Sequence, residues 1–79
     1  MKIQFYGRLA ERFGRHVELD IQSECSVAEL RRRLAADFPG FADVPGKRVR
    51  ACIGDTIVAD THLVRPGETV EFLPPVSGG

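Results

Sequence analysis

The sequence contains no tryptophan, one tyrosine, one methionine and only two cysteines among its 79 residues. Two cysteines, Cys25 and Cys52, cannot form a disulfide framework, so we expect a reduced, cytoplasmic protein. Eleven basic residues balance eleven acidic ones. A net charge of zero argues against a dedicated binder of nucleic acid or of a membrane surface. No apolar run approaches the ~20 residues of a membrane span, and the N-terminal segment reaches Arg8 too early for a signal peptide.

Groups that carry chemistry are equally scarce. A nucleophilic pair of Cys52 and His62 is conceivable, but a small strand residue and a loop histidine are the more ordinary interpretation. The two cysteines and two histidines are scattered without the paired spacing of a metal site, so we expect no metal. A chain this short hides only ~60% of its unfolded surface, which leaves one small domain and no deep catalytic cleft.

Apolar residues alternate with polar ones in several short segments, which is typical of half-buried strands. The predicted strands cover residues 2–6, 17–21, 49–53, 56–58 and 69–73. The polar segment 7–16 between glycines predicts a turn or loop, within which Leu9, Ala10 and Phe13 could form a short helical turn. We expect residues 40–47 to form a loop and residues 60–64 to be irregular.

One segment changes to a helical period. Ser26 and Glu29 have the spacing of a capping box, and Pro39 ends the helix because it disfavours helical geometry in the residue before it. The apolar stripe of this helix consists of Val27, Leu30, Leu34 and Phe38. The run Arg31, Arg32 and Arg33 is expected mostly on the opposite, solvated face.

The order strand, strand, helix, strand, short strand, strand predicts an α+β fold of the ubiquitin-like β-grasp type. In this fold a mixed sheet of four to five strands packs on one main helix, and the first and last strands pair in parallel. We expect a β-grasp domain over residues 1–74 and a flexible Gly-Gly tail over residues 75–79. Tyr6 and Leu73 face away from the helix, and an apolar patch rimmed by charge suggests a docking surface.

The C-terminal segment has a distinct design. Two prolines stiffen its base, whereas Gly78 and Gly79 have no side chain to block entry into a narrow channel. Six extended residues reach about 20 Å, which is far enough to enter the active site of another protein. The reactive group would be the α-carboxylate of Gly79, which an adenylating partner could activate and a sulfur source could convert to a thiocarboxylate. The alternative is a frayed terminus without function.

Three segments together resemble the small subunits of molybdopterin synthase, which are sulfur carriers in molybdenum cofactor synthesis. The resemblance rests on KIQFYGRLAE at residues 2–11, SVAEL at 26–30, and the ending PGE through VEFLPPVSGG at 66–79. The sequence departs from the family pattern at Leu73, where an aromatic residue is common, and at Ile53-Gly54, where Val-Asn is common.

The resemblance implies that an E1-like enzyme uses ATP to adenylate Gly79, and that a sulfur donor then forms the thiocarboxylate. The carrier would donate this sulfur to cyclic pyranopterin monophosphate within a heterotetramer whose large subunit holds the catalytic groups. No cofactor would be bound stably. Gly78 and Ser77 would thread the channel of the large subunit. By position, the residues that match the family's docking contacts are Tyr6, Ile57, Leu73, Pro74, Pro75 and Val76.

Three alternatives stay open. The same tail chemistry would serve a sulfur carrier for thiamine synthesis or for tRNA thiolation. A ubiquitin-like modifier or interaction module would instead join its Gly-Gly end to lysines of other proteins. The third alternative is a self-contained enzyme built on Cys52 and His62.

Overall fold

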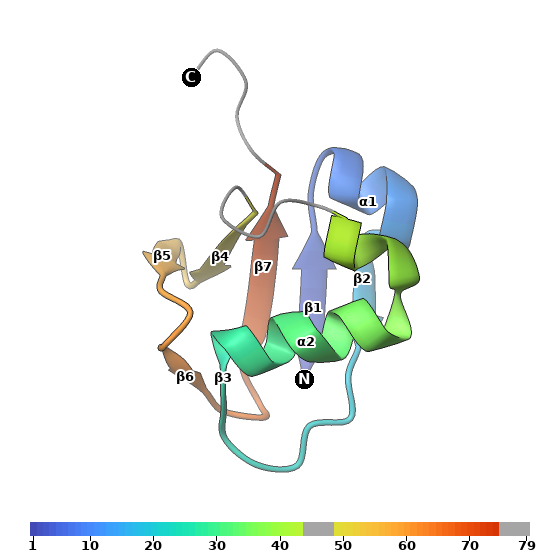
Figure 1. Ribbon diagram of the computed structural model, residues 1–79. Coiled ribbons are helices and arrows are strands. Elements are labelled where there is room, and N and C mark those ends of the chain that lie inside the picture. Colours follow the sequence, from blue (N-terminus) through green and yellow to red (C-terminus); the bar gives the residue numbers. More distant parts are fainter. Residues whose placement is uncertain (44–48, 75–79) are drawn as a thin grey trace.

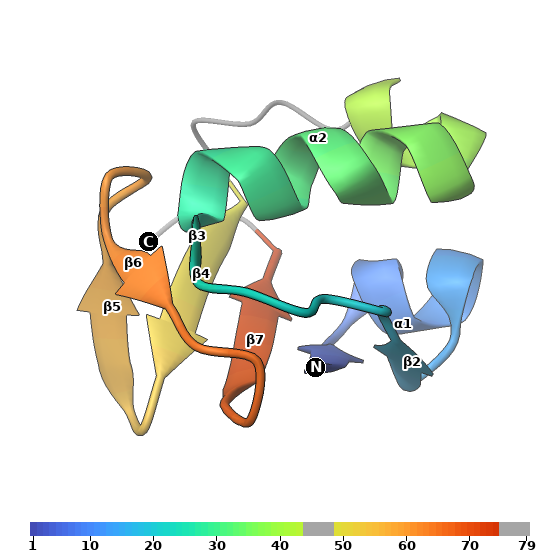
Figure 2. The ribbon, with the colours of Figure 1, turned by 90° about the horizontal axis from the view of Figure 1, so that it is seen from below.

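The computed structural model describes residues 1–43 and 49–74 as a sheet with its helices on one face (Figures 1 and 2). The five strands of the sheet lie in the order β2-β1-β7-β4-β5. β1 and β7 pair in parallel at the centre, and the other neighbours are antiparallel. The strand bounds are Lys2–Phe5 for β1, His16–Glu18 for β2, Arg50–Ile53 for β4, Thr56–Val58 for β5 and Thr69–Leu73 for β7. This is the predicted β-grasp arrangement.

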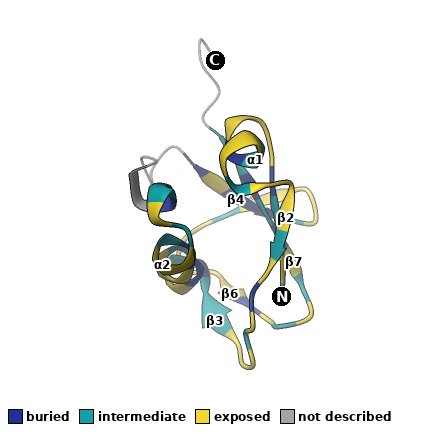
Figure 3. Ribbon diagram, turned by 90° about the vertical axis from the view of Figure 1, so that its right-hand side faces the viewer, coloured by how far each residue is buried: buried dark blue, intermediate teal, exposed yellow. Residues whose placement is uncertain are grey.

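The core lies between the inner face of the sheet and the helix α2, which spans Val27–Asp37. Figure 3 shows this layering from the side, with buried positions where the two layers meet. Full burial of an aliphatic or aromatic side chain contributes about 1.5–3 kcal/mol, so the stripe of α2 and the inward strand residues are the main source of stability. The largest fully buried side chains are Ile3, Val27, Leu30, Leu34, Val49, Val64, Val70 and Phe72.

The start of α2 confirms one half of the predicted capping box, the hydrogen bond to the Ser26 hydroxyl, whereas within residues 1–43 the Glu29 carboxylate is paired with Arg32 and not with the Ser26 N–H. Ser26 is extended at the N-cap, and its hydroxyl accepts a hydrogen bond from the Glu29 backbone N–H at 3.2 Å. The Glu29 carboxylate lies 3.8 Å from Arg32. The helix ends at Asp37, before Phe38 and Pro39, as the proline predicts.

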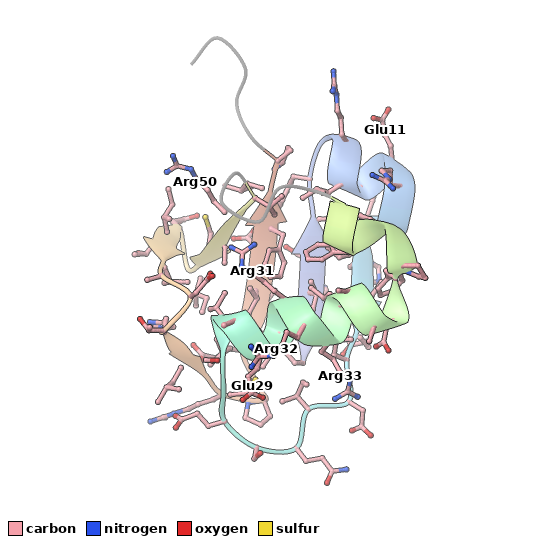
Figure 4. All side chains as sticks on the ribbon, in the orientation of Figure 1. Glu11, Glu29, Arg31, Arg32, Arg33 and Arg50 are labelled. Carbon is pink, nitrogen blue, oxygen red and sulfur yellow. The ribbon has the colours of Figure 1, made fainter. Side chains whose placement is uncertain are left out.

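The arginine run is only partly solvated, which corrects the prediction for Arg31. Its side chain points over the sheet, whereas Arg32 and Arg33 point outward (Figure 4). Arg31 donates to the Asp60 carboxylate at 2.9 Å and to the Val49 carbonyl at 2.7 Å. Its guanidinium also lies over the Phe72 ring at 5.4 Å. Arg31 therefore ties α2 to the sheet.

The segment after β1 forms a helix, α1, at Arg8–Phe13, where a turn or loop was predicted. Leu9 is buried in the core, and Phe13 packs at 5.6 Å from the ring of Phe5. The packing of these two side chains against the core explains why residues 8–13 form a helix. The sequence suggested only a short helical turn here. Gly7 and Gly14 bound the helix.

Three further predictions of local structure were wrong. β2 is only three residues long, because the chain turns where the N–H of Ile21 donates to the carbonyl of Leu19. The predicted irregular segment contains β6 at Leu63–Val64, which pairs with β3 at Cys25–Ser26. Part of the predicted loop after α2 is a 3-10 helix, η1, at Pro39–Asp43. Alternation indicated β2 but not its early end, and β3, β6 and η1 are too short for periodicity to indicate them.

The hairpin between β4 and β5 follows the expected turn chemistry. Gly54 and Asp55 both have positive φ, at 55° and 68°. Two central residues in this region define the type I′ turn that matches the twist of a hairpin. The turn sets the register that pairs Ile53 with Thr56 and Cys52 with Ile57.

Candidate functional site

The predicted tail begins at the end of the central strand β7. β7 is held on both sides, by β1 in parallel and by β4 in antiparallel pairing. The last residue of β7, Leu73, lies opposite Arg50 on β4. On the other side, the Tyr6 backbone N–H donates to the Phe72 carbonyl at 3.3 Å, which extends the pairing beyond β1. The chain therefore enters its C-terminal segment from the middle of the sheet.

Four of the predicted docking residues lie within the described part of the chain. Tyr6 is 40% exposed and Ile57 is 55% exposed, whereas Leu73 and Pro74 are half-buried. Alternation along β1 and β7 places Tyr6 and Leu73 on the face opposite α2. Ile57 shares this face, because its partner Cys52 pairs with Glu71, which is outward like Leu73.

These residues do not form one continuous apolar cluster. Tyr6, Leu73 and Pro74 gather at the end of β7, whereas Ile57 lies on the edge strand beyond β4. We call the group of Tyr6, Leu73 and Pro74 the tail-base patch. Among residues 1–43 and 49–74, no helix covers this face of the sheet (Figure 2).

The tail-base patch has a polar contact that sequence reasoning did not identify. The Tyr6 hydroxyl donates to the Glu71 carboxylate at 2.5 Å, and it also lies 3.2 Å from the Gln4 amide oxygen. The hydrogen bond to Glu71, desolvation and the nearby negative charge raise the pKa of Tyr6 above its ordinary value. The ring is therefore neutral and fixed in place. The signal was available, since alternation with inward Ile3, Phe5 and Phe72 places residues 4, 6 and 71 on the face opposite α2.

The alternative of a Cys52 nucleophile gains no support from its surroundings. Cys52 is buried although it is on the outer face, and burial raises the pKa of its thiol, with Glu71 adding to the effect. A neutral thiol is a poor nucleophile. His62 is exposed in the loop before β6, where its carbonyl accepts a hydrogen bond from the Val27 N–H.

A second residue that sequence reasoning missed is Gly7. It has φ of 57° and ψ of −132°, and a Cβ atom built on it would lie 2.8 Å from Cγ of Pro74. Such an approach is closer than real Cβ contacts allow. The available signal was a glycine directly after a strand, which often marks a close backbone approach.

The remaining predicted site residues lie outside the described part of the chain. They are the sulfur-bearing Gly79, the threading residues Gly78 and Ser77, and the docking residues Pro75 and Val76. The predicted tail of residues 75–79 therefore stays a prediction.

The part of the chain that the structure describes contains neither a metal-ligand cluster nor a membrane-spanning helix. No group of three or more His, Cys, Asp or Glu side chains is placed to hold a metal ion there. None of the helices in the described ranges is long and apolar enough to cross a membrane.

The five-stranded mixed sheet packed on one main helix defines a small ubiquitin-like domain. Residues 3–79 match the ThiS family, and the chain belongs to that family. Over its whole length it is 28% identical to the molybdopterin synthase sulfur carrier subunit of Escherichia coli K12, of which it covers 99%. It is 27% identical to the human protein of the same name, of which it covers 93%. The family is thus one of sulfur carriers.

The solved structures agree on the fold. The crystal structure of SAMP1, the small archaeal modifier protein 1 of Haloferax volcanii, superposes with a TM-score of 0.82 at 23% identity. The match covers 99% of this chain and 97% of that one. This likeness confirms the ubiquitin-like β-grasp.

Proposed function

We propose that this chain is the sulfur-carrier subunit of a molybdopterin synthase. The observation that carries the proposal is the end-to-end match to two sulfur-carrier subunits of that enzyme, which includes the Gly-Gly ending. The β-grasp domain of residues 1–74 would be the part that partner proteins bind, and residues 75–79 would enter their active sites. The proposed site of action is the cytoplasm, where the two unbridged cysteines would stay reduced.

The chemistry takes place at the α-carboxylate of Gly79. An E1-like enzyme joins this carboxylate to the AMP portion of ATP and releases pyrophosphate. Sulfur at the oxidation level of sulfide, supplied by a donor protein, then displaces AMP and leaves a thiocarboxylate. The thiocarboxylate sulfur attacks a carbon of cyclic pyranopterin monophosphate, and a C–O bond of that carbon breaks as the C–S bond forms. Water then hydrolyses the acyl–sulfur bond, which leaves the sulfur on the substrate and returns the carboxylate of Gly79. Two such rounds supply the two dithiolene sulfurs.

The domain contributes position rather than acid–base catalysis. Cys52 is buried and neutral, and the only tyrosine is held by Glu71. The tail-base patch and Ile57 would dock on the large subunit, so that the terminal sulfur meets the substrate within a fixed complex. Orientation of this kind contributes a large part of the rate in bimolecular reactions.

The first experiment tests sulfur loading. Purified chain is incubated with ATP, an E1-like enzyme that activates sulfur carriers of this family, and a sulfide source. The intact mass of the chain is then measured. We expect replacement of one terminal oxygen by sulfur, which depends on ATP. A mass that never changes would refute the proposal, because the carrier chemistry would be absent.

The second experiment tests the pathway. In three separate reactions, loaded chain is mixed with a molybdopterin synthase large subunit and cyclic pyranopterin monophosphate, with the thiazole-forming enzyme of thiamine synthesis, or with a tRNA-thiolating enzyme. We expect dithiolene formation in the first and no sulfur release in the other two. Sulfur release only with the thiazole-forming enzyme would assign the chain to the thiamine pathway, and sulfur release only with the tRNA-thiolating enzyme would assign it to that pathway. Lysine conjugates of the chain in cell extract would indicate a modifier.

A further inference from the structure

The base of the predicted tail lies against a backbone rather than against a side chain. Cγ of Pro74 is 2.8 Å from the position of a Cβ on Gly7, and Cδ and Cβ of the same ring follow at 3.7 and 3.9 Å. All three nearest atoms therefore belong to one proline ring. Only a residue without a side chain leaves room for the ring in this place.

Gly7 is also fixed in a backbone conformation that excludes other residues. Its φ of 57° combined with ψ of −132° lies in a region that L-residues with a Cβ rarely adopt. Glycine is thus required twice, for the conformation and for the approach of Pro74.

The turn around Gly7 is held from both directions. Before it, the Tyr6 N–H is bonded to Phe72 of β7 at 3.3 Å. After it, the Gly7 carbonyl accepts from the N–H groups of Ala10 and Glu11, at 3.1 and 3.3 Å. These two N–H groups belong to α1, and the buried side chain of Leu9 anchors that helix in the core. A support held in this way does not shift to suit the ring.

Pro74 itself has no backbone N–H to place it in the sheet. Its neighbour Leu73 is the last residue of β7, so the strand pairing ends one residue before the proline. With no ladder hydrogen bond at Pro74, the close contact with Gly7 helps to orient its ring relative to the sheet.

We propose that Gly7 is a positioning residue for sulfur delivery: it forms a seat for Pro74 and so sets the direction in which the tail leaves the domain. This inference rests on the proposed function, since it assigns a role in bringing the terminal sulfur to its acceptor. An L-residue at position 7 would displace Pro74 and redirect the tail, while the tail-base residues Tyr6 and Leu73 would keep their places in the sheet. The rate of transfer should fall much more than the affinity of docking.

The experiment compares Gly7→Ala with Gly14→Ala. Gly14 bounds the other end of α1, has φ of 92°, and has nothing within 4 Å of its Cβ position. Gly14→Ala therefore introduces backbone strain without touching Pro74. Each chain is loaded with sulfur, and we measure its dissociation constant for the large subunit and its single-turnover transfer rate. Because small misplacements cost large factors in rate, we expect transfer to slow by about tenfold or more in Gly7→Ala alone. The dissociation constant should rise by a smaller factor, since only the docking contact of Pro74 is displaced while those of Tyr6, Ile57 and Leu73 are kept.

A double-mutant cycle with Pro74→Ala tests whether the effect passes through the ring. Alanine has no Cγ, and the remaining Cβ contact of 3.9 Å is ordinary. The Gly7 substitution should therefore slow transfer less in the Pro74→Ala background than in the wild type. Equal slowing in both backgrounds would overturn the inference, as would equal slowing by Gly14→Ala.

A measurement on the wild type keeps the test independent of whether Gly7→Ala folds. Nuclear Overhauser effects between the Gly7 Hα atoms and the Pro74 ring protons should be present in solution, and their absence would refute the seat. Wild-type chain that never takes up sulfur would refute the proposed function instead. Wild-type and Gly7→Ala chains that transfer sulfur equally fast would refute this inference alone.

Discussion

At the scale of single residues, the outer face of the sheet is defined by a few side chains with contrasting environments. Tyr6 exposes its ring while its hydroxyl is bound to Glu71. Leu73 is half-buried in the central strand β7. Leu63 is 55% exposed, but it lies on β6, which belongs to the separate two-stranded sheet. Tyr6 and Leu73, which share the face opposite α2, are the side chains that we expect to contact a partner protein.

The Tyr6–Glu71 hydrogen bond leads to a prediction about titration. The chain has one tyrosine and no tryptophan, so tyrosinate absorbance reports Tyr6 alone. Since the folded pKa is raised above the ordinary 10.0, the contribution of Tyr6 to stability is present below pH 10 and is lost as the pH rises through the folded pKa. We expect the absorbance midpoint of the folded chain to exceed that of the urea-unfolded chain. Glu71→Gln should lower the folded midpoint, and an unchanged midpoint would contradict the assignment.

Leu73→Arg tests the tail-base patch. An unpaired charge buried against an apolar partner surface is costly, so we expect affinity for the large subunit to fall by about tenfold or more, which corresponds to roughly 1.4 kcal/mol. Calorimetric titration measures this, with thermal unfolding to verify the fold, because the new side chain lies opposite Arg50. Leu63→Arg is the matched control and should bind like the wild type. Equal loss in both variants would argue against a specific surface.

At the scale of elements, the long and periodic segments were predictable and the short ones were not. Alternation at Ile3 and Phe5 indicated β1, and the stripe from Val27 to Phe38 indicated α2. β3 and β6 have two residues each, which is one period of a strand and carries no pattern. Arg31 turns inward because Val49, Asp60 and Phe72 offer it contacts that only the folded chain assembles.

Ser26→Ala tests the cap of α2. Loss of an N-cap costs about 0.5–2 kcal/mol, so we expect the free energy of unfolding in urea to fall by that amount. The exposed neighbour Ser23 is the control, and Ser23→Ala should have little effect. Sulfur loading at 25 °C should be unchanged in both variants, because α2 lies on the face away from the tail-base patch. A stability loss that is equal in the two variants would contradict the capping role.

At the scale of the whole molecule, the proposed function divides the chain into a folded domain, residues 1–74, that would dock on partners and a C-terminal segment, residues 75–79, that would carry the sulfur. The fold and the outer-face position of two docking residues, Tyr6 and Leu73, could be predicted, because alternation determines which side of a sheet each residue occupies. The seat at Gly7 could not, because it depends on the exact approach of Pro74 to a turn that forms only when β1 and β7 pair. The roles of the residues after Pro74 stay predictions.

Removal of Gly79 tests this separation. Since β7 ends at Leu73, we expect the unfolding free energy to stay within about 0.5 kcal/mol of wild type, as is usual for changes away from packed features, while sulfur transfer is lost. The control is Gly67→Ala, in a turn where a Cβ would meet nothing within 4 Å. It should fold and transfer sulfur normally. Dithiolene formation by the shortened chain would contradict the role of Gly79.

The parallel pairing of β1 with β7 joins the two ends of the described chain, and this has a consequence for biogenesis. Bringing such distant segments together lowers the conformational entropy of the chain, and this loss is offset only when the contacts between β1 and β7 have formed. A nascent or truncated chain without β7 lacks the middle of its sheet and the partner strand for Tyr6. Under the proposed function, an activating enzyme that recognises the folded outer face would not bind immature chains, so completion of the fold would come before the ATP-dependent step.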